Sequence, residues 1–191
     1  VTDAGDGTAT LAGTPLNADV GDNSVVITVT DTAGATGSET FTVTVANTND
    51  APTLATAQAD ASAAEDAAYS LDVSGNFADV DVGDTLSYTA TGMPSTMTMS
   101  TAGVLSGTPV NADVGVYTVV VTATDGTASV TDTFDVTVTN TNDAPAVSST
   151  AVTAATEDSA YSYSITSTDD DSDSSDAWAI TCATCPSWLS V

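Results

Sequence analysis

The chain has 191 residues, 26 of them acidic, and it contains no Lys, Arg or His, so its formal net charge is −26 at pH 7. This composition argues against a nucleic-acid partner and against electrostatic attachment to an anionic membrane, because both need basic side chains that face phosphate. It also argues against an enzyme, since no basic side chain can serve as base, electrophile or oxyanion partner. The acids must face water, cations or one another, which favours a cation as partner.

The hydrophobic fraction of 41% is large enough for a packed core, although aromatic residues make up only 5% of the chain. No apolar run approaches the roughly 18 residues of a membrane span, and no signal-peptide pattern is present. We therefore expect no direct membrane contact from this segment, with export signals and any anchor lying outside it.

The sequence repeats itself, which bears on the fold before any strand is assigned. Asn-Thr-Asn-Asp-Ala-Pro occurs at 47–52 and returns 93 residues later at 140–145. A segment that begins Gly-Thr-Pro occurs at 13–21 and returns 94 residues later at 107–115. The two shifts agree within the length of a loop and indicate one repeating unit.

This period divides the chain into one complete unit at 51–143 and two halves. Residues 1–50 are predicted to be the C-terminal half of a unit, and residues 144–191 the N-terminal half of a further unit. One explanation is a two-domain period of a longer array, which we favour because an opened sandwich exposes sheet edges that promote aggregation. The other is that half-units of neighbouring copies complete one another between chains.

Strand signals dominate the units, and no stretch of ten residues shows a helical period. Apolar and polar residues alternate at 40–45 and at 133–138, which predicts strands with one buried and one wet face. Further strands are expected at 25–30, 68–73, 85–91, 116–124, 147–152 and 160–166. About seven strands per unit predict an all-β fold of tandem immunoglobulin-like Greek-key β-sandwiches. The expected core anchors are Tyr69, Tyr88, Tyr117 and Phe134, with sugar stacking as the alternative role.

Acidic and amide residues recur at three kinds of position. Linkers carry Asn49-Asp50 and Asn142-Asp143. Loops carry paired aspartates, in which Asp79, Asp81 and Asp84 correspond, at a shift of 92, to Asp171, Asp173 and Asp176. Single acids stand at Glu65, Glu157, Asp31 and Asp125. Since calcium takes about six to eight oxygen ligands, a junction between units can collect them from all three places.

The linker, the paired aspartates and the Thr124-Asp125-Gly126 loop resemble cadherin repeats, specifically the bacterial cadherin-like and “putative immunoglobulin” (dystroglycan-type cadherin-like) tandem repeats of very large surface proteins. The Gly-Thr-Pro segments resemble the latter, and the resemblance covers essentially the whole chain. It implies calcium at each junction, bound by an early-strand Glu of one domain, the linker, and the paired Asp plus a later Asp of the next domain.

Carried onto this sequence, the resemblance implies two ligand sets. The first junction would use Asn47, Asn49, Asp50, Asp79, Asp81 and Asp125. The second would use Glu65, Asn140, Asn142, Asp143, Asp171 and Asp173. Asp31 would serve the preceding junction and Glu157 the following one, while Asp84 and Asp176 either line these sites or stay solvated. Asn47 and Asn140 replace the usual Asp of animal cadherins, which implies weaker or fewer ions. The alternative interpretation is that Asn, Asp and Gly only form turns.

Cys182 and Cys185 are the only cysteines of the chain. In a secreted chain, this close pair favours a local disulfide over a redox centre. Zinc would need two further soft ligands, which the sequence lacks.

Together these features predict a structural segment of an extracellular, cell-surface repeat protein. It would be a stalk or filament with calcium-stiffened junctions that supports adhesion or cell–cell linkage. Its expected partners are neighbouring repeats and other copies in a filament, with glycans as a further option. One alternative is an adhesive module that recognises glycans or a partner cell surface. The other is a halophilic surface-layer component whose acids serve high salt without specific calcium sites.

Overall fold

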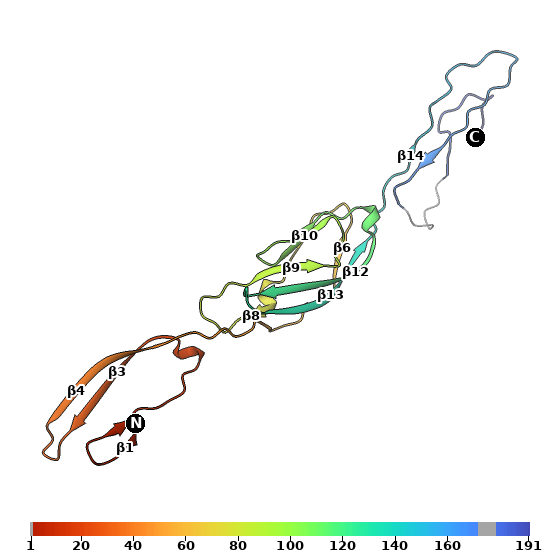
Figure 1. Cartoon of the computed structure of the whole chain (residues 1–191). Helices are drawn as coiled ribbons and strands as arrows, with labels where there is room; N and C mark the ends of the chain where they lie inside the picture. The colour runs from red at the N-terminus through yellow and green to blue at the C-terminus, as the bar shows by residue number, and fades with distance from the viewer. Residues whose placement is uncertain (1, 172–178) are drawn as a thin grey trace.

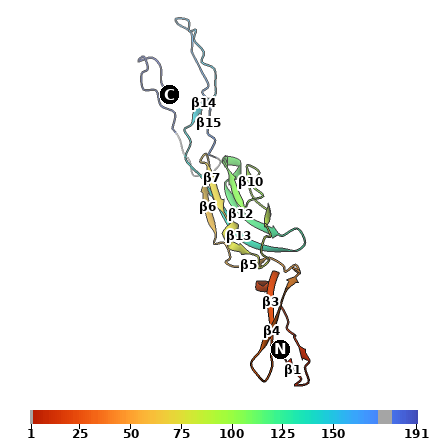
Figure 2. The same cartoon turned by 90° about the vertical axis from the view of Figure 1, so that its left-hand side faces the viewer.

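The computed structural model describes residues 2–171 and 179–191, and it shows three parts arranged end to end (Figures 1 and 2). A sandwich forms the middle part, a long hairpin dominates the N-terminal part, and mostly irregular chain forms the C-terminal part. The helices of the described residues are short 3-10 turns, namely η1 (Asn17–Asp19), η2 (Ser74–Asn76) and η3 (Asn111–Asp113). Within those residues, no helix has the length and apolar character needed to cross a membrane.

Two sheets make up the central sandwich. The first has the order β6-β13-β12-β9 and consists of β6 (Ala61–Ala64), β9 (Ser87–Thr91), β12 (Gly115–Thr124) and β13 (Ser129–Thr139). The second has the order β10-β11-β7 and consists of β7 (Tyr69–Asp72), β10 (Met97–Met99) and β11 (Val104–Gly107). A short pair, β5 (Thr53–Leu54) with β8 (Phe77–Ala78), lies beside them. All these pairings are antiparallel except that of β6 with β13.

The chain crosses between the sheets on the way from β7 to β9, from β9 to β10 and from β11 to β12. Such crossings characterise Greek-key immunoglobulin-like sandwiches, so the predicted fold class is confirmed for the central unit. The predicted strands at 68–73, 85–91 and 116–124 correspond to β7, β9 and β12. The short strands β6, β10 and β11 were not predicted.

The core lies between the two sheets and follows from the alternation of side chains along β12 and β13. Val121 and Val136 are fully buried, as is Leu105 of the opposing sheet. Each such burial contributes roughly 1.5–3 kcal/mol. The predicted aromatic anchors are confirmed as core residues. Tyr88 and Phe134 are buried, while Tyr69 and Tyr117 pack partly buried against the same cluster.

The N-terminal part has the hairpin without the sandwich. Its strands are β1 (Thr2–Asp3), β2 (Ala9–Thr10), β3 (Gly21–Thr30) and β4 (Thr36–Val45). β3 and β4 pair from Gly21↔Val45 to Thr30↔Thr36, which confirms the strands predicted at 25–30 and 40–45. Apolar side chains of this hairpin, among them Val29 and Val43, remain exposed.

The C-terminal part contains only β14 (Ala146–Val147) and β15 (Ser167–Thr168) among its described residues. The strands predicted at 147–152 and 160–166 are wrong, because residues 148–166 form no strand. Residues 147–152 correspond to 54–59 of the central unit, which form strand only at Leu54 of β5, whereas 153–156 and 161–164 correspond to β6 and β7, which pair with β13 and β11 from later in the unit. Residues 144–191 contain no counterparts of β11 and β13, so these stretches lack partners to form strands.

Candidate metal centre at the unit junctions

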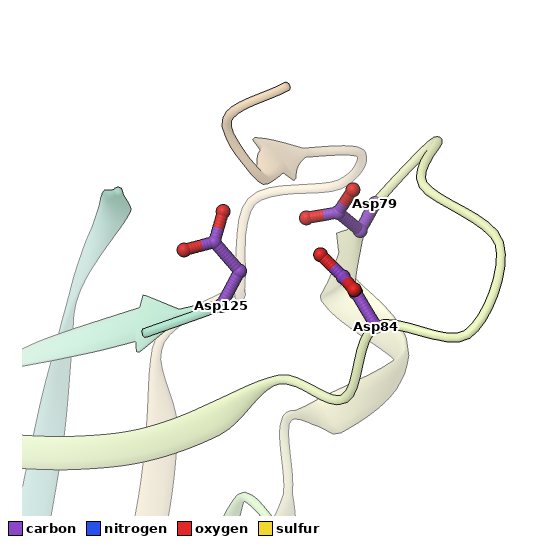
Figure 3. Close-up of side chains that lie close together, drawn as sticks. All are labelled: Asp79, Asp84 and Asp125. Atoms are coloured by element: carbon purple, nitrogen blue, oxygen red, sulfur yellow. The ribbon is translucent and has the colours of Figure 1, made fainter. Parts of the chain in front are cut away.

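Three carboxylates converge beside the first linker. Asp79 directly follows β8, Asp84 lies in the loop before β9, and Asp125 directly follows β12 (Figure 3). One oxygen from each lies within 4.8 Å of the others. The whole sequence has no basic side chain that could neutralise them. The arrangement therefore concentrates negative charge at one end of the sandwich.

Hydrogen bonds tie the linker to these loops. The backbone N–H of Asp50 donates to Oδ2 of Asp81 over 2.7 Å, and the N–H of Asp81 donates to Oδ1 of Asp79 over 2.9 Å. From the other side, Nδ2 of Asn49 donates to Oδ2 of Asp125 over 3.0 Å. These bonds hold the linker backbone and Asn49 between the two acidic loops, while the carboxylate of Asp50 itself accepts a 2.7 Å hydrogen bond from Nδ2 of Asn17.

Two oxygens at this junction are buried and have no hydrogen-bond partner, namely Oδ2 of Asp79 and Oδ1 of Asp81. Asp81 as a whole is only 5% exposed. A buried carboxylate oxygen without a donor carries a desolvation penalty that a hydrogen bond or a cation offsets. The donor set is all oxygen, as hard divalent cations require, so these residues fit calcium.

The pKa values of two carboxyl groups in the cluster are shifted in directions that fit a cation-binding site. Partial loss of hydration and repulsion from Asp81, Asp79 and Asp125 raise the pKa of Asp84. The backbone N–H groups of Ala128 and Thr127 lower the pKa of Asp125, with a smaller contribution from Asn49. Asp125 is thus held as a carboxylate, whereas the charge on Asp84 is costly until a cation offsets it.

The second linker repeats the pattern of the first with a changed register. The N–H of Asp143 donates to Oδ2 of Asp171 over 2.8 Å, and the N–H of Asp171 donates to Oδ1 of Asp169 over 3.2 Å. Asp169 and Asp171 therefore correspond to Asp79 and Asp81, at a shift of 90. The predicted correspondence of Asp171 and Asp173 with that pair is wrong, and Asp173 lies outside the described residues.

Sequence reasoning missed Asp169 because the acidic run that begins there can be aligned with the loop of Asp79 and Asp81 in several ways. The signal that resolves them is the strand pair before the run. Thr168 of β15 pairs with Ala146, just as Ala78 of β8 pairs with Thr53. The residue after each of these strands, Asp169 or Asp79, then takes the same place.

Glu65 joins the second junction from the central sandwich. Its side chain is 1% exposed, and Oε1 accepts a 2.7 Å hydrogen bond from the N–H of Thr141. Its Oε2 is buried without a hydrogen-bond partner. Nearby, Nδ2 of Asn140 donates to Oδ1 of Asp171 over 3.1 Å. The structure therefore ties Glu65, Asn140, Asp143 and Asp171 to one linker.

The remaining predicted site residues lie at the surface. Asn142 donates to the carbonyl of Asp143, as Asn49 does to that of Asp50, each over 2.8 Å. Asp31 is exposed and accepts from the N–H groups of Ala33 and Ala35. Asn47 and Glu157 are exposed. Cys182 and Cys185 form a disulfide with a Cα–Cα distance of 5.9 Å.

The sandwich and its acidic ends define an immunoglobulin-like repeat. The family described as “Putative Ig domain” matches residues 5–46 and 51–139, more than half of the chain. The chain therefore belongs to this family. No curated protein matches it.

Several solved structures are similar to part of the chain. Protocadherin gamma B7 extracellular cadherin domains 1–4 are 19% identical over 82% of this chain and 42% of that one, with a TM-score of 0.43. The endo-fucoidan hydrolase MfFcnA4 H294Q of glycoside hydrolase family 107 is 27% identical over 68% and 20%, with a TM-score of 0.41. A SusE-like surface located polysaccharide binding protein of Bacteroides thetaiotaomicron is 18% identical over 62% and 24%, with a TM-score of 0.38. The chain thus spans less than half the length of each.

Proposed function

We propose that this chain is a structural segment of an extracellular repeat protein, a cell-surface stalk or filament whose junctions bind calcium and are stiffened by it. The observation that carries the proposal is the pair of buried, unpartnered oxygens of Asp79 and Asp81. Asp79 is one of the three converging carboxylates of the first junction, and Asp81 accepts a hydrogen bond from Asp50 of the linker. A chain without basic residues has no side chain of its own that could neutralise them.

The first junction would draw its ligands from the linker and the central unit, and the second from the linker and the units on both sides. The first would use Asn47, Asn49, Asp50, Asp79, Asp81, Asp84 and Asp125. The second would use Glu65, Asn140, Asn142, Asp143, Asp169 and Asp171. Calcium supplies the positive charge that these oxygens lack and accepts several of them at once.

Stiffening follows from where the ligands lie. A short linker leaves two units free to bend, whereas an ion shared by the linker and a unit removes that freedom. Extracellular calcium modules have dissociation constants of about 10⁻⁴ to 10⁻³ M. At free calcium about tenfold above the dissociation constant, one site stabilises the bound arrangement by roughly 1.4 kcal/mol. Such sites suit a calcium-rich exterior, and the partners they imply are neighbouring repeats.

The test measures calcium binding and shape on the same full chain. Calorimetry and elemental mass spectrometry would measure bound calcium, and small-angle scattering with and without chelator would measure the stiffness of the rod. We expect bound calcium and a rod that becomes more flexible with chelator. The double substitution of Asp79→Asn and Asp81→Asn should weaken calcium binding at the first junction at least about tenfold, since it removes two charged ligands.

The matched control is Glu39→Gln, which removes a charge from an exposed side chain of β4, away from both linkers. It should leave calcium binding unchanged. A scattering profile that ignores the chelator, with no calcium bound at millimolar concentration, would overturn the proposal. Stability that follows NaCl alone would instead favour the halophilic alternative.

A further inference from the structure

Two short turns of sequence Asn-Ala-Asp, η1 and η3, each contact the linker that follows their unit. η1 lies beside the first linker, and η3, drawn in green, lies at the end of the sandwich beside the second (Figure 1). In both turns the first residue donates from Nδ2 to a carboxylate of the linker. Asn17 reaches Oδ2 of Asp50 over 2.7 Å, and Asn111 reaches Oδ2 of Asp143 over 3.3 Å. The same contact therefore occurs at both junctions, and neither asparagine belongs to the ligand sets implied by the resemblance.

Hydrogen bonds fix each turn on its own unit. In η3, Asp113 is only 5% exposed, and its Oδ2 accepts a 2.6 Å hydrogen bond from Oγ1 of Thr96, which lies directly before β10. The same Oδ2 accepts from the N–H of Val110 over 3.2 Å, and in η1 Oδ2 of Asp19 accepts from the N–H of Leu16 over 2.9 Å. The asparagine that starts each turn is therefore held at a defined place on its unit.

The linker aspartate is held from both sides. Its carboxylate accepts from the asparagine of the unit before it, and its N–H donates to the acidic loop after it, from Asp50 to Asp81 and from Asp143 to Asp171. Because side-chain torsions occupy few staggered wells, a fixed carboxylate limits the directions available to the N–H of the same residue. The two bonds thus join one unit to the next without an ion.

An asparagine suits this place better than an acid, because its amide donates to the carboxylate without adding a second negative charge. Only Oδ2 of each linker aspartate accepts a hydrogen bond among the described residues, so Oδ1 stays available to an ion. Asn111 and Asp143 line a hollow of about 360 Å³, and Asn17 and Asp50 line one of about 300 Å³. Both pairs can therefore be reached from solvent.

We propose that Asn17 and Asn111 are positioning residues of the junctions. Each fixes the following linker aspartate so that the N–H of this aspartate meets the acidic loop of the next unit, which sets the orientation of the two units before any ion binds. A second consequence rests on the proposed calcium function. The aspartate is already oriented when calcium arrives, so less ordering has to accompany binding.

The experiment measures amide hydrogen exchange by NMR on the full chain in chelator. Asn17→Ala is expected to raise the exchange rate of the Asp50 N–H about two- to tenfold, as the loss of one hydrogen bond of ordinary strength would do, and to leave the Asp143 N–H unchanged. Asn111→Ala should do the reverse. Each variant is thus the matched control of the other, with the same net charge.

The N–H of Val121, in the middle of β12, reports the stability of the whole sandwich and should exchange at the same rate in all these chains. Unchanged rates at Asp50 and Asp143 would overturn the proposal. So would rates that rise at both linkers in either variant, or that rise only together with the rate of Val121, since the asparagines would then serve general stability alone.

Asn111→Asp adds a readout that a purely structural role does not move. In chelator the new carboxylate repels that of Asp143, so the Asp143 N–H should exchange faster than in Asn111→Ala. With saturating calcium the new carboxylate lies beside a proposed ligand and supplies a further oxygen, so the order of the two variants should reverse.

The two arms separate this proposal from the calcium function. Rates that change as expected in chelator and do not respond to calcium would support the positioning role and contradict the calcium function. Calcium that binds to the wild type, together with unchanged rates for both alanine variants in chelator, would contradict the positioning role and leave the calcium function standing.

Discussion

The hairpins β3–β4 and β12–β13 differ in burial far more than in sequence. Both run for ten or more residues, share their pairing register and alternate apolar with polar side chains. Only β12–β13 faces an opposing sheet among the described residues, and only its inward side chains are fully buried. The difference shows that local pattern is enough to specify a hairpin, whereas the stability of the inward face comes from the other half of the unit.

The largest expected difference in stability between the two regions is that between the variants Leu105→Ala and Leu11→Ala. Removal of the buried Leu105 side chain is expected to lower the free energy of unfolding of the central unit by about 2–5 kcal/mol, through lost burial and a cavity. Leu11 is half exposed, so its removal should leave that unit unchanged. Urea unfolding followed by tyrosine fluorescence measures both. Equal losses would mean that Leu11 contributes to the stability of the central unit as Leu105 does, which would contradict the difference in burial.

Two glycines at corresponding positions of the repeat, Gly107 and Gly13, test the same difference in packing between the two regions. A Cβ at Gly107 would press on the carbonyl oxygen of Thr96 and lie 2.8 Å from Cα of Met97, whereas a Cβ at Gly13 would meet nothing within 4 Å. Gly107→Ala should therefore cost about 1–3 kcal/mol of stability through overpacking. Gly13→Ala should cost little or nothing, and thermal unfolding of the two variants decides the point.

Much of the central fold could be predicted from the sequence because period-two alternation survives in β12 and β13 and because the unit contains all its own partners. The aromatic anchors Tyr88 and Phe134 were predictable for the same reason. The strands predicted within 147–166 failed since alternation reports a preference for a pleated surface and not the presence of a neighbour. β10 and β11 are too short to show a period.

The sequence predicts that acids of the linkers and loops form the candidate site. It does not predict which aspartates of the second acidic run correspond to Asp79 and Asp81. Linker repeats fix Asp50 and Asp143 without ambiguity, and the hydrogen bonds confirm that they occupy equivalent places. Asp169 was not predicted because neighbouring aspartates are chemically identical and only the backbone pairing of β15 distinguishes among them. The burial of Glu65 could not be predicted either, since it depends on contact with Thr141 of the linker, 76 residues later in the chain.

The smallest expected effects concern two acids of the first junction whose pKa values move in opposite directions. The lowered pKa of Asp125 means that its carboxylate stabilises the fold above the unfolded value of 3.8, and that this contribution disappears as pH falls through the folded pKa. The raised pKa of Asp84 means the reverse. Its ionisation destabilises the fold above the folded pKa, and the penalty is relieved as pH falls below that value.

In chelator, Asp125→Asn should therefore lower stability at neutral pH and lose its effect in acid. Asp84→Asn should raise stability at neutral pH and also lose its effect in acid. Asp31→Asn, in the corresponding turn of the N-terminal hairpin, is the control and should leave the central unit unchanged. Urea unfolding from neutral pH to below 3.8 measures all three.

Bound calcium should reverse the sign of the stability change caused by Asp84→Asn, and of that variant alone. A bound cation turns the repulsion among Asp79, Asp84 and Asp125 into shared coordination, so Asp84→Asn then removes a ligand and lowers stability. The effect of Asp125→Asn should keep its sign and grow. If Asp84→Asn stabilised the chain equally with and without calcium, this carboxylate would belong to the solvated surface, and the first junction would bind its ion through the linker, Asp79, Asp81 and Asp125.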